Sequence, residues 1–485
     1  MDKKVIALIR EDKVPVDHRV PLTPSQATQT QKKFDVICQS STLRCFPDEE
    51  YRQVNIPVVD SVQSADILMG VKEVPIDHLI ADKTYLFFSH TIKKQTYNRE
   101  LLRAILNKNI RLIDYERLTN QENQRVVAFG RFAGIVGAYN GLYTFGKKFG
   151  LYDIRRAKDC FDLADLRTEY AKIKLPAIKI AITGTGRVAQ GAAEVLDEVG
   201  IQRVLASNFL SQNFQEPVYT QLGVTQYNQR KDGKPFQEQD FYDHPEQFVP
   251  SFLPFAQQAD LLIAGAYWDA NSPVLFYREE MLKEDFKIKV IADITCDIEG
   301  SIPSTKQPST IDDPIYDYNP WNDQVVKPYH NQQTVSVMAV DNLPSELPRD
   351  ASQAFGEALL EHVLPNLLGD DSDGMIAQAT ITEHGRLTEP YRYLQDFVDG
   401  KEWKKPAVGL ASSIVFLLEG NYPFIEIRNS SLFCVPFMRE SKNSIASLEV
   451  ISDMSLRSIH TRDSSSLSIN KSSRRVPEAG TSIAG

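Results

Sequence analysis

The hydrophobic positions of this chain form short apolar runs, and amphipathic stretches separate them over most of its length. Apolar runs of about four to eight residues predict buried strands, whereas apolar residues three and four apart predict helices. The pattern predicts strands at 4–9, 66–71, 84–89 and 110–115, with helices at 24–34 and 98–108. Strands that alternate with helices are typical of a parallel α/β domain.

A second α/β series begins near residue 177. Its strands are predicted at 177–184, 203–207, 259–267 and 289–295. The apolar, Gly- and Ala-rich stretch 130–150 suits a tightly packed helix that bridges two domains. The amphipathic stretch 345–370 predicts a long helix that returns the chain to the first domain. The sequence therefore predicts two Rossmann-like α/β domains with parallel sheets and a cleft between them.

The first domain is expected to be discontinuous, because the chain returns to it after the second. We assign residues 1–135 plus 345–404 to a substrate-binding, catalytic domain and residues 136–344 to a dinucleotide-binding Rossmann domain. Residues 405–485 are Ser-rich and aperiodic, and this atypical tail is expected to be partly disordered.

Composition narrows the possible partners. With 485 residues and 42% hydrophobic content, the chain can build two or three globular domains. A formal net charge of -10 argues against a nucleic-acid-binding surface, so small molecules are the expected partners. No apolar stretch reaches membrane-span length, and the charged N-terminus does not resemble a signal peptide. We expect no membrane partner, and the pattern leaves the oligomeric state open.

The five cysteines lie far apart and have neither zinc-site nor disulfide-framework spacing, which favours reduced thiols in a cytoplasmic protein without a metal. They are Cys38, Cys45, Cys160, Cys296 and Cys434.

The stretch AITGTGRVAQGAAEVLDEVG, residues 181–200, has the pattern of a strand, a glycine turn and a helix. In a dinucleotide-binding domain, Gly184 would allow the tight turn and Gly186 would let the backbone approach a pyrophosphate. Gly191 or Ala192 would let the helix pack close to the strand. The helix N-terminus would then face the phosphates. The alternative is a glycine-rich turn that binds nothing.

An acidic residue that holds the adenosine ribose is expected about twenty residues later, at the end of the next strand. The stretch RVLASNFL, residues 203–210, offers the neutral Ser207 and Asn208 instead. Without a carboxylate to repel a 2′-phosphate, NADP is permitted, so the cofactor is written NAD(P). We expect NADPH to be accepted at least comparably with NADH, and Asn208→Asp to shift the preference toward NADH.

Charged residues follow the predicted strands in three stretches of the first domain, at 9–24, 70–75 and 87–95. Together with the stretches at 112–118, 126–142, 266–273, 292–303 and 340–352, they resemble the alanine dehydrogenase/transhydrogenase superfamily. Within it, the chain resembles the lysine-forming saccharopine dehydrogenases and lysine-ketoglutarate reductase domains. The resemblance runs from about residue 5 to 403, and VDNLPSELPRDAS and AYWDANSP are its most specific pieces.

The resemblance implies an NAD(P)-dependent amino-acid dehydrogenase that interconverts lysine, 2-oxoglutarate and NAD(P)H with saccharopine. Its acid/base pair falls on Lys72 and His90. Histidine titrates near neutrality unaided, whereas a lysine needs burial or a neighbouring cation, such as Lys93, to lower its pKa. Arg19 falls on the carboxylate-binding arginine. Further substrate contacts are implied for Gln95, Arg125, Phe129, Thr295, Cys296 and Asp297.

Cofactor contacts are implied for Gly184, Gly186, Arg187, Asn208, Tyr267, Ile294, Val340, Asp341, Asn342 and Leu343. Two positions depart from the NAD-dependent members: Asn208 replaces an aspartate, and Gln124 replaces a cofactor-contacting arginine found in some of them. Two alternatives stay open. One is alanine dehydrogenase-like reductive amination of another 2-oxo acid, and the other is a degenerate nucleotide-binding protein.

Overall fold

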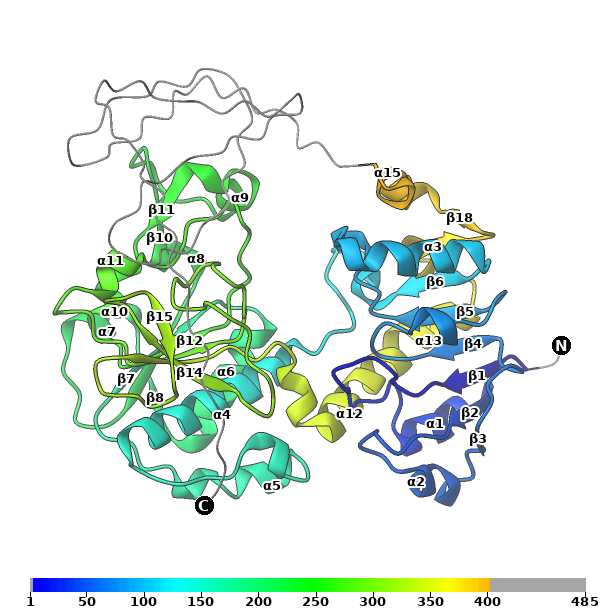
Figure 1. The fold of residues 1–485 in the computed structure, drawn as a ribbon, viewed down its shortest axis with the longest axis horizontal. Helices are drawn as coiled ribbons and strands as arrows, with labels where there is room; N and C mark the ends of the chain where they lie inside the picture. The colour runs from blue at the N-terminus through cyan, green and yellow to red at the C-terminus, as the bar shows by residue number, and fades with distance from the viewer. Residues whose placement is uncertain (1–2, 402–485) are drawn as a thin grey trace, which may run out of the picture. The chain divides into compact units, whose positions relative to one another are not determined.

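The computed structural model describes residues 3–401, which form two eight-stranded α/β sheets (Figure 1). The predicted tail at 405–485 lies outside the described residues. The α/β fold class predicted from the hydrophobic pattern is confirmed.

The first sheet has the strand order β18-β17-β6-β5-β4-β1-β2-β3. Its strands are β1 Val5–Leu8, β2 Asp35–Gln39, β3 Val58–Val59, β4 Ile67–Met69, β5 Thr84–Phe87, β6 Arg111–Asp114, β17 Thr380–Glu383 and β18 Arg386–Leu387. Strands β1 to β6 run parallel, whereas β17 pairs antiparallel with β6, and β18 pairs antiparallel with β17. Because β17 and β18 come from the end of the described chain, the first sheet is discontinuous in sequence, as expected.

The second sheet has the order β15-β14-β16-β13-β12-β7-β9-β8. Its strands are β7 Lys179–Thr183, β8 Gln202–Arg203, β9 Val218–Leu222, β12 Leu261–Ala264, β13 Val290–Asp293, β14 Ile315–Asn319, β15 Gln324–Val326 and β16 Val335–Met338. A separate antiparallel pair consists of β10 Asn228–Arg230 and β11 Phe248–Pro250. Because β14 pairs antiparallel with β15 and β16, the second sheet, like the first, is mostly but not wholly parallel.

The helices include both long helices expected from the sequence, one as α4 and one as α12 continued through a π-helical turn, Leu359–Val363, into α13. The α-helices are α1 Pro24–Thr30, α2 Asp48–Gln53, α3 Arg99–Asn107, α4 Gly130–Phe149, α5 Leu163–Arg167, α6 Arg187–Val199, α7 Ala206–Ser211, α8 Val224–Tyr227, α9 Glu238–Asp243, α10 Leu253–Ala256, α11 Arg278–Met281, α12 Pro348–Ala358, α13 Leu364–Leu368, α14 Met375–Ala379 and α15 Gln395–Asp399.

Both faces of each sheet are covered by apolar side chains. On the second sheet, α4 and α6 cover one face, and a cluster that includes Phe209, Phe252 and Phe276 covers the other. Residues of β12 and β13 are all buried, so these strands read as continuous apolar runs rather than alternating ones. This is why the sequence pattern located them.

Helices α4 and α6 pack with their backbones in close contact (Figure 1). A β-carbon added at Gly134 would overlap the Val188 carbonyl oxygen, and one added at Gly191 would overlap the Arg131 carbonyl oxygen. Gly191 therefore allows α6 to approach α4, whereas the sequence predicted that Gly191 or Ala192 allows this helix to pack closely against the preceding strand. This contact holds the start of α6, and hence the glycine turn, in place.

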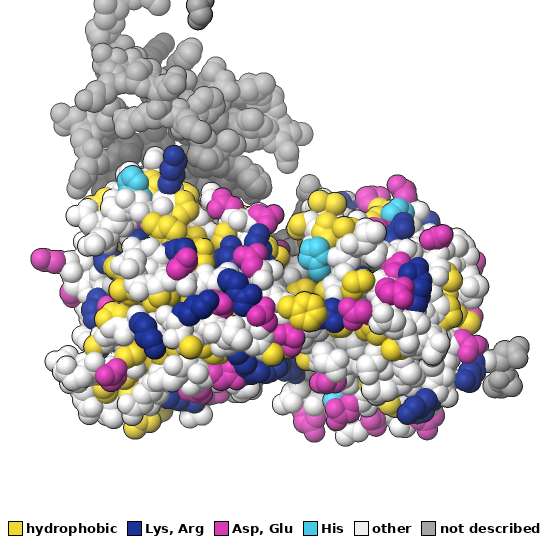
Figure 2. All heavy atoms as spheres, turned by 90° about the horizontal axis from the view of Figure 1, so that it is seen from below, with side chains coloured by type: hydrophobic (Ala, Val, Ile, Leu, Met, Phe, Trp, Pro, Cys, Tyr) yellow, Lys and Arg dark blue, Asp and Glu magenta, His cyan; other side chains and the backbone are white. Residues whose placement is uncertain are grey.

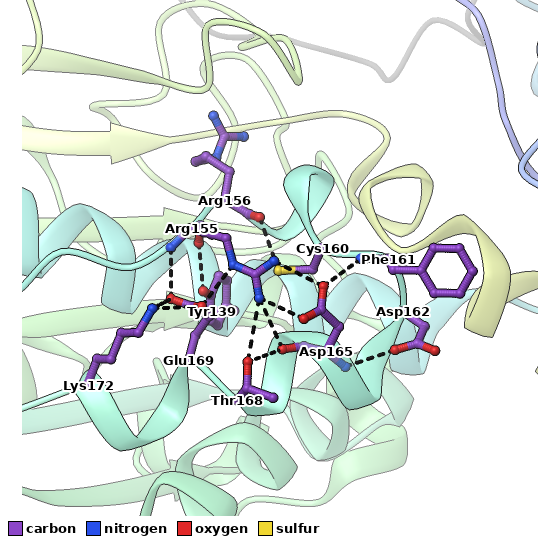
Figure 3. Close-up of polar contacts among 10 residues, drawn as sticks. All are labelled: Tyr139, Arg155, Arg156, Cys160, Phe161, Asp162, Asp165, Thr168, Glu169 and Lys172. Carbon is purple, nitrogen blue, oxygen red and sulfur yellow. Dashed lines mark hydrogen bonds and ion pairs between the residues drawn. The ribbon is translucent and has the colours of Figure 1, made fainter.

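A polar network fixes the segment between α4 and β7 (Figure 3). The Arg155 guanidinium donates to both carboxylate oxygens of Asp165, at 3.0 and 2.8 Å, and to Glu169 at 2.8 Å. Lys172 donates to both Glu169 oxygens, at 2.9 and 2.7 Å, and the Tyr139 hydroxyl donates to the Arg155 carbonyl at 2.6 Å. The network thereby ties this connecting segment to α4.

The surface charges, the helices and the possible metal ligands of residues 3–401 each bear on what the sequence suggested. Basic and acidic side chains are interspersed on the face shown in Figure 2. Within residues 3–401, none of the helices combines the length and apolar character needed to cross a membrane. The same residues contain no group of three or more His, Cys, Asp or Glu side chains placed to hold a metal ion.

Replacing Gly191 by Ala should destabilise the fold, because its β-carbon meets the backbone of α4 rather than a side chain that can move. We expect a cost of about 1–3 kcal/mol, measured as a lower thermal unfolding midpoint. Gly186→Ala is the matched control, since a β-carbon there meets nothing within 4 Å. Equal midpoints for the two variants would contradict the close helix contact.

Candidate active site

The carboxyl end of β4 is held by a buried glutamate from the segment that follows the neighbouring strand β1. Glu11 accepts hydrogen bonds from the backbone N–H of Val71 at 2.5 Å and of Lys72 at 2.9 Å. Strand β1 lies between β4 and β2, so the chain leaves β1 on one side and returns on the other. Ligands of open α/β sheets bind at such a reversal, and Lys72 stands there.

The pKa of Lys72 is lowered, first by burial and then by the charge of Arg19, with a further contribution from Lys13. The nearby Asp17 carboxylate opposes these effects. Burial and neighbouring cations thus lower the pKa of this lysine, as the sequence suggested. The cations are Arg19 and Lys13 rather than the expected Lys93, whose Nζ lies 3.7 Å from Glu116 Oε1.

His90 follows β5, the strand beside β4, and contacts the residue after Lys72. Its Nδ1 lies 2.7 Å from Glu73 Oε1, and Lys13 Nζ lies 2.5 Å from Glu73 Oε2. Burial raises the pKa of Glu73, but the hydrogen bonds from His90 and Lys13 outweigh it and lower the pKa to about 2. An ionised Glu73 accepts the Nδ1 proton, which leaves Nε2 as the ring atom that can exchange protons with a substrate.

The backbone at His90 is strained. Its φ of 53° is in the left-handed region that non-glycine residues seldom adopt. Such conformations persist only where the surrounding structure enforces them, and here the Glu73 contact and a 3.3 Å hydrogen bond from Asn98 to the His90 carbonyl do so.

Arg19 is almost fully buried, and its guanidinium is already paired. It donates to Asp17 from Nε at 2.9 Å and from Nη2 at 2.5 Å. Nη2 also donates to Asn342 Oδ1 at 2.9 Å, and the Asn342 amide donates to Asp17 at 3.0 Å. The guanidinium lies 4.0 Å above the Phe129 ring. The Nε–Nη2 edge is therefore occupied by Asp17, and only Nη1 remains to meet a substrate carboxylate.

Asp293, at the end of β13, organises the loop that holds three predicted site residues. It accepts hydrogen bonds from Thr295 N at 3.1 Å, Thr295 Oγ1 at 2.6 Å and Cys296 N at 3.3 Å. Cys296 Sγ lies 3.8 Å from Asp341 Oδ1. Burial and then the Asp293 charge raise the pKa of Asp297, and the charge of Lys93, from the segment after β5, opposes them.

Other predicted substrate residues are more exposed. Gln95 accepts a hydrogen bond from the Tyr97 hydroxyl at 2.6 Å, and both side chains are exposed. Arg125 is half exposed, and its Nη1 lies 3.9 Å from Glu116 Oε1. These residues do not contact Lys72 or His90 in the hydrogen bonds and ion pairs found within residues 3–401.

The glycine turn has the geometry that a pyrophosphate requires. Gly184 has φ 99°, and a β-carbon there would lie 3.0 Å from Ala266 Cα, so only glycine fits. A β-carbon on Gly186 would meet nothing within 4 Å, which leaves an open approach to the first turn of the thirteen-residue helix α6. The turn and helix start therefore fit a dinucleotide phosphate group.

The remaining predicted cofactor residues lie around this turn and the neighbouring strand ends. Arg187 points to the Arg125 carbonyl, to which it donates a hydrogen bond. Tyr267, after β12, is 91% exposed. Val340 and Leu343 are buried, and Gly137 of α4 packs against Ile294 and Leu343.

One structural expectation is wrong. Asn208 does not lie at the end of the strand beside β7; it lies inside helix α7. The strand before it, β8, ends at Arg203 and pairs only with β9, so it is the sheet edge. The strand beside β7 is β9, which ends at Leu222. Sequence order predicts β8 beside β7, but β9 occupies that place and the two-residue strand β8 lies at the edge.

Glu11, Asp17, Glu73 and Asp293 were not among the predicted site residues. Each is a carboxyl group that contacts a predicted site residue, and Glu11 and Asp293 stand at or just after the carboxyl end of a parallel strand. The signal was present in their positions, because parallel strands bring such residues to one edge of a sheet.

Comparison with known families agrees with this geometry. Residues 7–136 match the family model "Alanine dehydrogenase/PNT, N-terminal domain", and residues 167–390 match "Alanine dehydrogenase/PNT, C-terminal domain". The chain belongs to the alanine dehydrogenase/PNT family. The family predicted from the sequence is thereby confirmed, and the predicted enzyme class agrees with the names of the relatives described next.

Individual relatives are more distant. A mitochondrial alpha-aminoadipic semialdehyde synthase of Mus musculus is 29% identical over 82% of this chain, and the chain covers 48% of that protein, about half its length. An NAD(+), L-lysine-forming saccharopine dehydrogenase of Yarrowia lipolytica is 27% identical over 73% of this chain and 90% of its own. A solved L-alanine dehydrogenase, 18% identical, covers 82% of this chain and all of its own, with a TM-score of 0.56, and shares the fold.

Glu11→Gln should change how stability depends on pH. Burial, and then the Asp17 charge, raise the pKa of Glu11 from 4.5 to about 8. The folded chain then holds a proton that the unfolded chain releases, so this stabilisation is complete below about pH 4.5 and is lost as pH rises through 8. Wild type should lose stability relative to the variant between pH 5 and 8, by at most about 1.4 kcal/mol per pH unit.

Thermal unfolding midpoints across this pH range measure the effect. The exposed Glu122→Gln is the matched control and should differ from wild type by a constant amount. Parallel curves for Glu11→Gln and wild type would show that Glu11 is ionised in the fold.

Proposed function

We propose that the chain is an NAD(P)-dependent oxidoreductase of saccharopine dehydrogenase type. It joins the ε-amine of lysine to 2-oxoglutarate, with oxidation of NAD(P)H and release of water, to form saccharopine, and it also runs the reverse reaction. The observation that carries the proposal is the hydrogen-bonded pair Glu73–His90, which lies directly after Lys72 at the ends of β4 and β5.

The proton-transfer roles belong to Lys72 and His90. Because burial and nearby cations lower the pKa of Lys72, a larger share of this lysine is neutral and can accept a proton from the attacking amine. His90 Nε2, free of the Glu73 contact, protonates the oxygen that leaves as water when the imine forms. Glu73 holds the imidazole in the orientation and tautomer that this role needs.

Arg19 and the second sheet provide binding and orientation. Arg19 offers Nη1 to a substrate carboxylate while Asp17 and Asn342 hold the rest of the guanidinium. Gly184, Gly186 and the start of α6 would hold the phosphates of a dinucleotide, which when bound would supply the hydride for reduction of the imine.

An alanine dehydrogenase-like reaction of ammonia with another 2-oxo acid uses the same fold, and the choice of amine separates the two. Reduced-nicotinamide absorbance, followed with NADH and with NADPH, should fall faster with lysine plus 2-oxoglutarate than with ammonia plus pyruvate. Faster oxidation with ammonia and pyruvate would replace the proposed function by that alternative. No oxidation with either pair would leave a nucleotide-binding protein.

Lys72→Met and His90→Asn should each lower turnover by about 10² to 10⁴ while the dissociation constant for the nucleotide stays nearly unchanged, because a positioned acid or base acts on the reaction and not on the cofactor. Steady-state rates and fluorescence titration measure the two quantities. The exposed Lys33→Met is the control for loss of a lysine and should retain wild-type turnover. Unchanged turnover in both site variants would refute the assigned roles.

A further inference from the structure

The strand order of the second sheet places a different segment beside the glycine turn than the sequence suggested. Strand β7 pairs with β9 over five residues, from Lys179 opposite Val218 to Thr183 opposite Leu222. In dinucleotide-binding domains, the residue that faces the adenosine ribose stands at the carboxyl end of the strand next to the glycine-turn strand. In this chain that end is Leu222, and the residues that follow it start at Gly223.

Hydrogen bonds hold the end of β9 against the turn. Gly184 N donates to the Leu222 carbonyl at 2.8 Å, and the Gln221 amide donates to the Gly184 carbonyl at 3.0 Å. A β-carbon on Gly223 would lie 3.6 Å from Thr185 Cγ2, inside the turn itself. The segment after β9 is therefore in direct contact with the turn.

The side chains of this segment are neutral. Gly223 precedes helix α8, in which Thr225 and Gln226 are exposed. Gln226 Oε1 accepts a hydrogen bond from Gly223 N, so its amide group lies next to Gly223. Residues 217–231 contain neither Asp nor Glu. Arg230, the nearest arginine along the chain, is paired with Asp232 and Asp240 rather than turned to the glycine turn.

We propose that the segment Gly223–Gln226, and not Asn208, selects the cofactor, and that its neutral side chains admit a 2′-phosphorylated dinucleotide at least as well as the unphosphorylated one. The inference rests on the proposed function only in requiring that the glycine turn binds a dinucleotide. An acid here would accept hydrogen bonds from both ribose hydroxyls and repel a 2′-phosphate. Thr225 and Gln226 offer hydrogen bonds without that repulsion.

Gln226→Glu tests the proposal with a nearly isosteric change. A carboxylate oxygen of the new glutamate can still accept the hydrogen bond from Gly223 N–H. The local fold is therefore kept while a negative charge is placed beside the turn. We expect the ratio of NADPH to NADH dissociation constants to rise by about tenfold or more, and the ratio for 2′,5′-ADP against 5′-AMP to rise likewise. Thr225→Asp provides a second, independent variant on the same segment.

Asn208→Asp is the matched control, because it adds the same charge in α7, after the edge strand β8. It should change the cofactor ratio by less than about twofold. A ratio that responds to Asn208→Asp and not to the Gln226 or Thr225 variants would overturn this inference and leave the proposed function intact. Strong preference of wild type for NADH would also overturn it. If none of these nucleotides binds, both the inference and the proposed function fail.

Discussion

The Asp17–Arg19 ion pair is the interaction on which the candidate site depends, because both side chains are almost fully buried, at 1% and 3% exposure. A buried charge without a partner costs several kcal/mol, so neither residue could stand there alone. The pair also orders its surroundings. Arg19 lies over Phe129 and binds Asn342, and its charge contributes to the lowered pKa of Lys72. One pairing therefore links the predicted substrate arginine, the predicted acid/base lysine and the predicted nicotinamide segment.

The hydrogen bonds of Asp17 and Arg19 to Asn342 connect the segment after β1 to the segment after β16. Asn342 belongs to the segment after β16, whereas Asp17 and Arg19 follow β1. A substrate carboxylate bound at the remaining Nη1 would therefore share one guanidinium with Asp17 and Asn342. Arg19 would thus connect the proposed substrate site to the segment predicted to lie under the nicotinamide.

Much of the fold could be predicted from the sequence because buried parallel strands leave continuous apolar runs, as in β12 and β13. Lys72 and His90 were located by their motifs, and their proximity follows from the parallel pairing of β4 with β5. What the local pattern does not encode is strand order. The two-residue strand β8 lies at the sheet edge, so the predicted place of Asn208 beside the glycine turn was wrong. The antiparallel strands β17 and β18 join the first sheet without a strong hydrophobic pattern in the sequence. The buried role of Glu11 also depends on a tertiary contact, since its neighbours in sequence are charged.

In the proposed function, this chain moves a hydride onto an imine formed between lysine and a 2-oxo acid. The most direct measurement is mass spectrometry of the product made from lysine, 2-oxoglutarate and a reduced nicotinamide cofactor that carries deuterium at its transferable position. We expect saccharopine with one deuterium on the carbon that joins the glutarate part to the lysine nitrogen. Deuterium in glutamate or in a hydroxy acid, or an unlabelled product, would contradict it.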